Sequence, residues 1–184
     1  SSEEDLTLTF LRGGQVCTVK GKREYGEELG LEFQSPLFDG IRTCRNRCEF
    51  CFVAQMPPGL RRSLYLRDDD YRLSFLTGSF VTLTNLTEAD WERIAVQGLS
   101  PLYVSVHATD RATRARLLGR GRIPDIREQL RRLAEMGVEV HTQVVLVPGV
   151  NDGRVLEQTV ADLAALYPSV ASVSLVPVGL TQFQ

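Results

Sequence analysis

The sequence predicts an α/β fold built on a curved parallel sheet, and three observations lead to that class. From residue 70 onward, β-rich runs alternate with amphipathic helical runs, which is typical of βαβ units. Polar side chains lie on one side of each predicted strand, whereas strands covered by helices on both faces are apolar throughout. Three cysteines are crowded into one loop ahead of this region. We therefore expect one packed face and one face that lines a polar ligand.

The segment before residue 41 is expected to be β-rich and separate from the core. Its β-rich runs are residues 6–11, 15–19 and 28–33. The first two flank Gly13-Gly14, which predicts a hairpin, and the third would add a short strand. Residues 1–40 are too few to form a stable domain, so residues 41–184 are expected to be the core.

The core elements are predicted in order from their patterns and caps. Strands are expected over residues 72–84, 102–107, 138–147 and 170–178, and helices over residues 87–94, 126–136 and 155–166. Thr87 is the expected N-cap of the first helix, with Asp90 three residues later. Gly137 is expected to end the second helix.

The side-chain alternation supports a two-faced sheet. The polar pairs that share a strand side are Arg72 with Ser74, Ser105 with His107, His141 with Gln143, and Ser172 with Ser174. An antiparallel sheet with one wet face would show the same alternation, but the intervening helices favour a parallel one. The polar side is then expected to line a ligand site.

Composition excludes several classes of protein. The net charge of the 184 residues is −2, so no basic excess indicates nucleic-acid binding. No apolar run approaches the roughly 20 residues that span a membrane. Three of the four cysteines share one loop, which argues against a disulfide framework and for a reducing compartment, so we expect a cytoplasmic protein. Cys17 is interpreted as a small hydrophobic residue.

The cysteine loop contains Cys44, Cys48 and Cys51 in a C-x3-C-x2-C arrangement, with Phe50 before the last thiol. A structural zinc or a ferredoxin-type cluster takes four protein ligands, so three thiolates leave one metal position open to a small molecule. A zinc site that borrows a distant histidine and a partial disulfide pattern are the alternatives.

This spacing resembles the signature of the radical SAM superfamily. The resemblance implies a [4Fe-4S] cluster on the three cysteines, S-adenosylmethionine on its open iron, and a partial (β/α) barrel. Residues 52–61, 63–65, 68–75, 82–86, 99–109, 148–153 and 176–180 further resemble an uncharacterised bacterial and cyanobacterial group of iron–sulfur proteins with a PDZ-like N-terminal segment. That resemblance implies that residues 1–40 end or follow a PDZ-like part, and that the core stops after its fifth strand.

The resemblance also implies a set of cofactor-binding residues. These are Phe50, Gly78, Ser79, Ser105, His107, Gln143 and Gly149. Gly78 and Ser79 stand where the superfamily often has a Gly-Gly-Glu segment, and a bulge in a strand is the alternative interpretation of that glycine. For residues 148–153 the alternative is a turn in which Asn151 or Asp152 caps the next helix.

Other polar residues are candidates by position alone. Asp68-Asp69-Asp70 would bind a cation or a basic substrate, or form a solvated loop. Arg45 and Arg47 would lower the thiol pKa values, or lie in solvent. The further candidates by placement are Gln55, Arg61, Arg72, Asn85 and His141.

Together these features lead us to expect a radical SAM enzyme of unknown substrate. The substrate is a peptide or protein if a PDZ-like neighbour grips chain termini or strands. A flavodoxin or ferredoxin would supply electrons, and no membrane or nucleic-acid partner is expected. One alternative is an iron–sulfur electron-transfer or sensor protein with His107 or His141 as fourth ligand. The other is a zinc-stabilised interaction domain.

Overall fold

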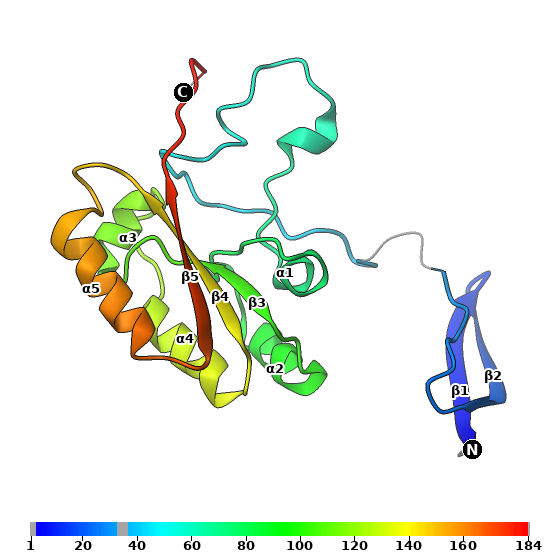
Figure 1. The fold of residues 1–184 in the computed structure, drawn as a ribbon. Coiled ribbons are helices and arrows are strands. Elements are labelled where there is room, and N and C mark those ends of the chain that lie inside the picture. Colours follow the sequence, from blue (N-terminus) through cyan, green and yellow to red (C-terminus); the bar gives the residue numbers. More distant parts are fainter. Residues whose placement is uncertain (1–2, 33–36, 184) are drawn as a thin grey trace. The chain divides into compact units, whose positions relative to one another are not determined.

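The computed structural model describes residues 3–32 and 37–183 (Figure 1). The chain forms two compact units, Ser1–Phe38 and Asp39–Gln184.

The first unit contains an antiparallel hairpin of β1 (Glu3–Arg12) and β2 (Gln15–Glu24). Gly13 and Gly14 form its two-residue loop with φ values of 59° and 81°, which glycine adopts without steric cost. The predicted hairpin is therefore confirmed, with longer strands than expected. The strand expected over residues 28–33 is wrong for residues 28–32, which are irregular because Gly26 and Gly30 turn the chain at positive φ. Phe33 lies outside the described residues.

The second unit is built on a three-stranded parallel sheet. Its strands are β3 (Leu102–Ser105), β4 (Val140–Leu146) and β5 (Val170–Pro177), in the order β3-β4-β5. The parallel arrangement agrees with the sequence prediction. Val81 adds a single parallel bridge to Val104 beside β3. The sheet is open, so the described strands do not close into a barrel.

Helices connect the strands and cover one side of the sheet (Figure 1). They are α1 (Tyr71–Thr77), α2 (Glu88–Gln97), α3 (Arg111–Leu117), α4 (Ile126–Glu135) and α5 (Gly153–Ala164), with a 3-10 turn η1 (Arg62–Tyr65). Thr87 is the N-cap of α2 as predicted and forms a capping box with Asp90, and Gly137 follows α4 at φ 73° as predicted. Among the described residues, no helix is both long and apolar enough to cross a membrane.

The core lies between the sheet and these helices. Ile94 of α2, Leu133 of α4 and Leu163 of α5 are fully buried against the strands. Along β4, Val140, Thr142 and Val144 are buried, whereas His141, Gln143 and Val145 are partly exposed. One face is thus packed and the other is open, as the alternation of polar residues predicted.

Residues 72–84 correct the sequence prediction, because most of the expected first strand is helix α1 and a loop. The Asp70 side chain caps this helix by accepting from the Arg72 N–H at 3.0 Å. Gly78 ends it in the left-handed region at φ 75°. Gly78 is therefore a helix C-cap and not a bulge in a strand. Arg72 and Ser74 do not share a strand face, since Ser74 is buried and its hydroxyl donates to the Tyr103 carbonyl at 3.2 Å.

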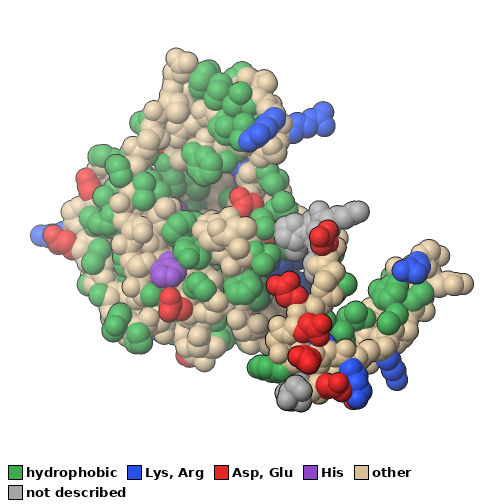
Figure 2. All heavy atoms as spheres, turned by 45° about the vertical axis from the view of Figure 1, so that its right-hand side comes forward, with side chains coloured by type: hydrophobic (Ala, Val, Ile, Leu, Met, Phe, Trp, Pro, Cys, Tyr) green, Lys and Arg blue, Asp and Glu red, His purple; other side chains and the backbone are tan. Residues whose placement is uncertain are grey.

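Exposed hydrophobic side chains gather near the top of the space-filling view (Figure 2). This region holds the loop after the cysteines and the segment that follows β5. Its most exposed members are Phe52 at 78% and Leu180 at 67%. Of these two residues, Phe52 also lines a cavity of the second unit.

Candidate functional site

A cavity of about 580 Å³ lies at the carboxyl ends of the strands in the second unit. Parallel α/β sheets place their ligand sites at this edge. The cavity is lined by all three cysteines of the loop and by six of the seven residues expected to bind a cofactor: Phe50, Gly78, Ser79, Ser105, His107 and Gln143. Segments far apart in the sequence therefore converge on one space.

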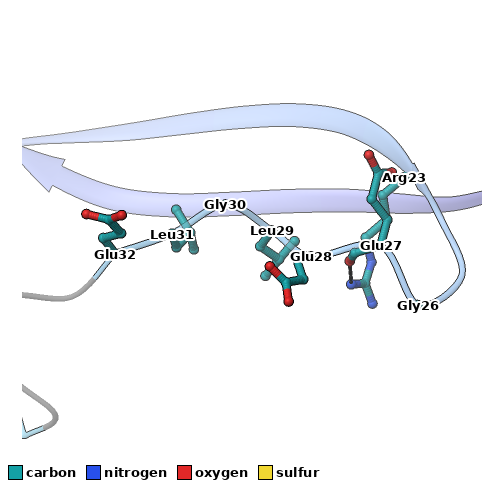
Figure 3. A pocket seen from close by; sticks show the side chains of 8 residues that line it. All are labelled: Arg23, Gly26, Glu27, Glu28, Leu29, Gly30, Leu31 and Glu32. Atoms are coloured by element: carbon teal, nitrogen blue, oxygen red, sulfur yellow. Dashed lines mark hydrogen bonds between the residues drawn. The ribbon is translucent and has the colours of Figure 1, made fainter.

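A second cavity of about 570 Å³ lies in the first unit (Figure 3). Residues 26–32 run along the hairpin and line it together with Arg23. The Arg23 guanidinium is already engaged, since it donates to the Glu27 carbonyl and to Glu4, each at 3.0 Å. The lining offers no thiol and no histidine. The cavity of the second unit is therefore the candidate functional site.

Cys44, Cys48 and Cys51 are free thiols and half-buried. Burial raises the pKa of the Cys48 thiol to about 12, and the neighbouring Cys44 and Cys51 add to the rise. Burial also raises the pKa of Cys44, which the nearby Arg67 partly opposes. Arg45 and Arg47 have exposed side chains, as expected of solvated loop residues. Without a bound metal, the Cys44 and Cys48 thiols are therefore expected to be protonated at neutral pH.

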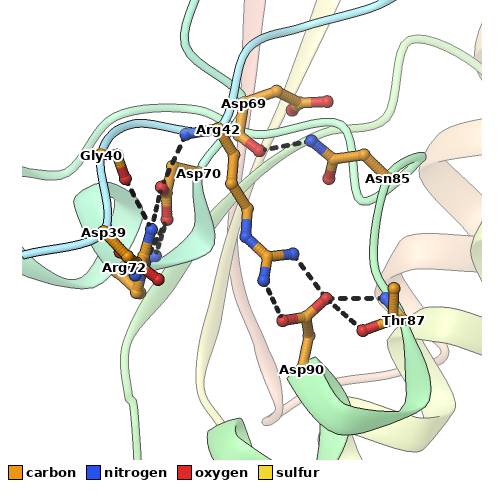
Figure 4. A network of polar contacts seen from close by, with 9 residues as sticks. All are labelled: Asp39, Gly40, Arg42, Asp69, Asp70, Arg72, Asn85, Thr87 and Asp90. Atoms are coloured by element: carbon orange, nitrogen blue, oxygen red, sulfur yellow. Dashed lines mark hydrogen bonds and ion pairs between the residues drawn. The ribbon is translucent and has the colours of Figure 1, made fainter. Parts of the chain in front are cut away.

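The chain that enters the cysteine loop is anchored by charged residues (Figure 4). Arg42 points its guanidinium at Asp90 and donates to both carboxylate oxygens at 2.5 Å. Its backbone N–H donates to Asp70 at 3.0 Å. Just beyond, the Cys44 N–H donates to the Arg67 carbonyl at 2.7 Å. The start of the loop is thus tied to helix α2 and to the residues that precede α1.

The three consecutive aspartates have different roles. Asp69 is buried and accepts from the N–H and hydroxyl of Thr82 at 2.6 and 2.7 Å. Asp70 is buried as the cap of α1. Only Asp68 lines the cavity. The expectation that residues 68–70 bind a cation or form a solvated loop is therefore wrong for Asp69 and Asp70. Both carboxylates are buried and already accept hydrogen bonds from within the protein.

His107 is held rigidly at the floor of the cavity. Its φ of 63° is unusual for a residue with a side chain, and the Asn151 amide stabilises this turn by donating to the His107 and Val145 carbonyls, each at 2.8 Å. Its Nδ1 accepts from the Val145 N–H at 3.2 Å. The ring meets the edge of Phe50 at a centroid distance of 4.7 Å. Burial lowers the pKa of His107 to about 3, so the ring is neutral and its proton lies on Nε2.

His141 lies outside the cavity. Its Nδ1 pairs with the Ser172 hydroxyl at 2.8 Å, and its ring stacks on Tyr103 with a centroid distance of 4.9 Å. Neither Ser172 nor Ser174 lines the cavity. The structure therefore brings Ser105, His107 and Gln143 together, whereas His141, Ser172 and Ser174 lie on β4 and β5 away from the cavity.

Gly149 does not line the cavity either. It lies in the turn after β4 at φ 73°, and its N–H donates to Asp152 at 2.9 Å. Asn151 accepts from the Val147 N–H at 2.7 Å in the same turn. These residues thus form a strand-to-helix turn, in which Asn151 supports the site through His107.

Gln55 joins the cysteine loop to the segment after β5. Its amide donates to the Gly179 carbonyl at 3.3 Å, and its side-chain oxygen accepts from the Thr181 N–H at 2.8 Å. Asn85 supports the Asp69 backbone at 2.8 Å, and Arg72 pairs with Asp70 and Asp39 (Figure 4). These candidates are therefore internal supports and not ligand contacts.

Several residues that line the cavity were not predicted from the sequence. They are Phe52, Val53, Arg67, Phe80, Thr82, Val145, Val176, Pro177 and Gly179. Helix α3 was not predicted either, although Asp110 ahead of it is a recognisable N-cap that accepts from the Thr113 N–H at 2.7 Å. Most of the missed lining is apolar, and apolar residues carry no chemical signal in a sequence.

Comparison with known proteins identifies the family. A family model described as a radical SAM-like domain matches residues 23–173. The chain therefore belongs to the radical SAM-like domain family. Among solved structures, the chain is similar to the crystal structure of a radical SAM methyltransferase from Sphaerobacter thermophilus, with 26% identity and a TM-score of 0.39. The match covers 56% of this chain and 31% of that chain, so it spans less than a third of the methyltransferase. No curated protein matches the sequence.

Proposed function

We propose that this chain is part of a radical SAM enzyme, whose [4Fe-4S] cluster is held by Cys44, Cys48 and Cys51. The observation that carries the proposal is the convergence of these three free thiols on the cavity that Ser105, His107 and Gln143 also line. Membership of the radical SAM-like domain family supports the same cofactors. S-adenosylmethionine would bind in this cavity beside the cluster.

The donor set suits a cluster better than a single ion. A structural zinc takes four protein ligands, whereas three thiolates leave one position open to a small molecule such as S-adenosylmethionine. A zinc-stabilised interaction domain is therefore the weaker alternative.

The protein's own residues would hold and orient the ligand. When bound, the cluster and S-adenosylmethionine supply radical chemistry through reductive cleavage of a carbon–sulfur bond. Ser105 and Gln143 would offer hydrogen bonds from the open sheet face, and neutral His107 would donate from Nε2. Gly78 and Ser79 would shape the opposite wall with Phe50. Phe52, Phe80 and Val176 would keep water from the reacting atoms.

The proposal extends to the rest of the fold, the substrate class, the electron donor and the cellular compartment. The parallel sheet and the Val81 bridge would form part of a partial (β/α) barrel. The hairpin unit would belong to a PDZ-like part, which would favour a peptide or protein substrate. A flavodoxin or ferredoxin would supply electrons. A reducing cytoplasm would keep the three thiols available for metal.

The test is anaerobic reconstitution with iron and sulfide, followed by reduction in the presence of S-adenosylmethionine. We expect iron incorporation and 5′-deoxyadenosine from the parent protein, and loss of both in Cys48→Ala, because two thiols cannot hold the cluster. Cys17→Ala is the matched control, since Cys17 lies in β2 of the other unit and should change neither readout. Iron without 5′-deoxyadenosine would favour electron transfer or sensing. Absence of iron in the parent would contradict the proposal.

A further inference from the structure

The end of helix α3 is in backbone contact with the cysteine loop. The N–H of Arg47, just before Cys48, donates to the Leu118 carbonyl at 2.9 Å. A Cβ atom on Gly119 would lie 2.3 Å from the Arg47 carbonyl oxygen and 2.8 Å from its carbonyl carbon. Backbone atoms cannot give way as the end of a flexible side chain can. Any larger residue at position 119 must therefore displace the loop.

The same stretch of the loop is held from a second side. Asn46 is only 2% exposed, and its amide donates to the Thr82 hydroxyl at 3.0 Å. Its side-chain oxygen accepts from the Thr84 hydroxyl at 3.2 Å. The three residues between Cys44 and Cys48 thus sit between the end of α3 and the segment beside β3.

Helix α3 is in turn fixed to the cavity floor by Arg114. This fully buried side chain donates to the carbonyls of Thr82, Ser105 and Val106 at 2.8, 3.2 and 3.0 Å. Thr82 and Ser105 line the cavity, and Val106 precedes His107. The helix therefore connects the floor of the cavity to the loop that carries the thiols.

We propose that Gly119 is a positioning residue, which seats the cysteine loop so that Cys48 faces the same space as Ser105 and His107. The inference rests on the proposed role of the cysteines, which Gly119 supports without touching a ligand. A side chain at position 119 pushes Arg47 away from Leu118, and Cys48 moves with it. The thiols then lose their common cavity, while the strands and the core stay in place.

The test compares Gly119→Ala with Gly98→Ala. Both glycines follow a helix at φ 59°, so alanine strains the backbone equally at the two positions. A Cβ on Gly98 would have no atom within 4 Å, whereas one on Gly119 would strike the loop. The comparison therefore separates the collision from the cost of the backbone conformation. Both variants are made in the full chain with Cys17→Ala, so that only the three loop thiols are measured.

Two readouts decide the proposal. In the metal-free protein, the thiols of Gly119→Ala should react with iodoacetamide about tenfold faster than those of Gly98→Ala. The displaced loop would expose thiols that are half-buried in the parent. After reconstitution, Gly119→Ala should retain much less iron per chain, while circular dichroism shows both variants folded. Equal alkylation rates and equal iron contents would overturn the proposal. Faster alkylation in a protein whose parent holds no iron would uphold the positioning and refute the cluster.

A second variant covers the case in which Gly119→Ala does not fold. Asn46→Ala removes the other anchor, and the Thr82 and Thr84 hydroxyls remain paired with each other at 2.9 Å. The loop thiols should again react faster than in the parent. An unchanged alkylation rate in Asn46→Ala would show that the cysteine loop keeps its position without these contacts, which would contradict the proposal.

Discussion

The role of His107 is decided by its neighbours. Val145 donates to Nδ1, Phe50 packs against the ring, and Asn151 holds the backbone in its left-handed turn. Its remaining nitrogen, Nε2, carries the proton. Because Nδ1 already accepts from Val145, only the Nε2–H of the neutral ring is left to donate to a ligand, as the proposed function requires.

Substituting His107 tests this role. Glutamine places an amide N–H near the position of Nε2, whereas asparagine reaches only as far as Nδ1. We expect His107→Asn to bind S-adenosylhomocysteine about fivefold more weakly and His107→Gln to stay close to the parent, since one hydrogen bond contributes about 1 kcal/mol. Calorimetric titration measures both. Asparagine tolerates positive φ better than glutamine does, so backbone strain would give the opposite ranking.

The pH dependence of the same binding provides an independent prediction. The lowered pKa of about 3 means that His107 stays neutral throughout the physiological range. Affinity should therefore be unaffected by this residue between about pH 5 and pH 8, where an ordinary histidine titrates. The His107→Gln variant serves as the control for other titrating groups. A fall in affinity below about pH 6 in the parent, absent from His107→Gln, would show that the ring becomes charged.

The N-termini of helices α1 and α2 hold the segment that leads into the cysteine loop. Asp70 caps α1 and also accepts from the Arg42 backbone. Asp90 closes the capping box of α2 and also accepts from the Arg42 guanidinium. One segment is thereby fixed to the N-termini of two helices. Short helices such as α1 depend on such contacts, because their intrinsic stability is marginal.

Asp90 should make stability depend on pH. Burial tends to raise the pKa of Asp90, but hydrogen bonds from Arg42 and Thr87 outweigh it and lower the pKa from 3.8 to about 2. The contribution is therefore present above about pH 4 and is lost as the pH falls toward 2. We expect Asp90→Asn to lower the free energy of unfolding by about 2 kcal/mol at pH 7.

Urea unfolding at about pH 7 and pH 3 measures this effect. The difference between the parent and Asp90→Asn should shrink at the lower pH. Glu88→Gln is a control in the same helical turn, because Glu88 pairs with Arg132 at the surface and should matter little. A difference that is independent of pH would contradict the assigned ion pair.

The second unit owes its stability to a core shared by helices α2, α4 and α5 and the sheet. Ile94 is fully buried in this cluster, whereas Val96, two residues later in the same helix, is 80% exposed. The open face of the sheet carries the cavity and contributes little to this packing. Substitutions in the core and at the site should therefore have separable effects.

Ile94→Ala tests this separation. The truncation should lower the free energy of unfolding by about 2–5 kcal/mol, because it leaves a cavity among packed side chains. Val96→Ala should change it by less than about 0.5 kcal/mol. Thermal or urea unfolding of the two variants provides the comparison. Equal losses would mean that α2 does not pack on the sheet as described.

Local patterns sufficed for the hairpin about Gly13-Gly14, the caps Thr87 and Gly137, and the parallel strands, because short-range sterics and hydrogen bonds decide such features. Helix α1 escaped prediction because residues 72–84 are β-rich, whereas the contacts of Ser74 with the Tyr103 backbone, distant in the chain, hold this segment as a helix beside β3. The cysteine spacing indicated the family that the matching family model shows.

Two features could be found only in the tertiary structure. They are the cavity that the cysteines share with Ser105 and His107, and the contact of Gly119 with the Arg47 backbone. Arg47 and Gly119 lie far apart in sequence, and neither carries a recognisable motif. Their contact exists only because helix α3, fixed through Arg114 to the strand ends, brings its last turn beneath the loop. A chain's local conformations follow from neighbouring residues, whereas the approach of distant backbones follows from how the whole core packs.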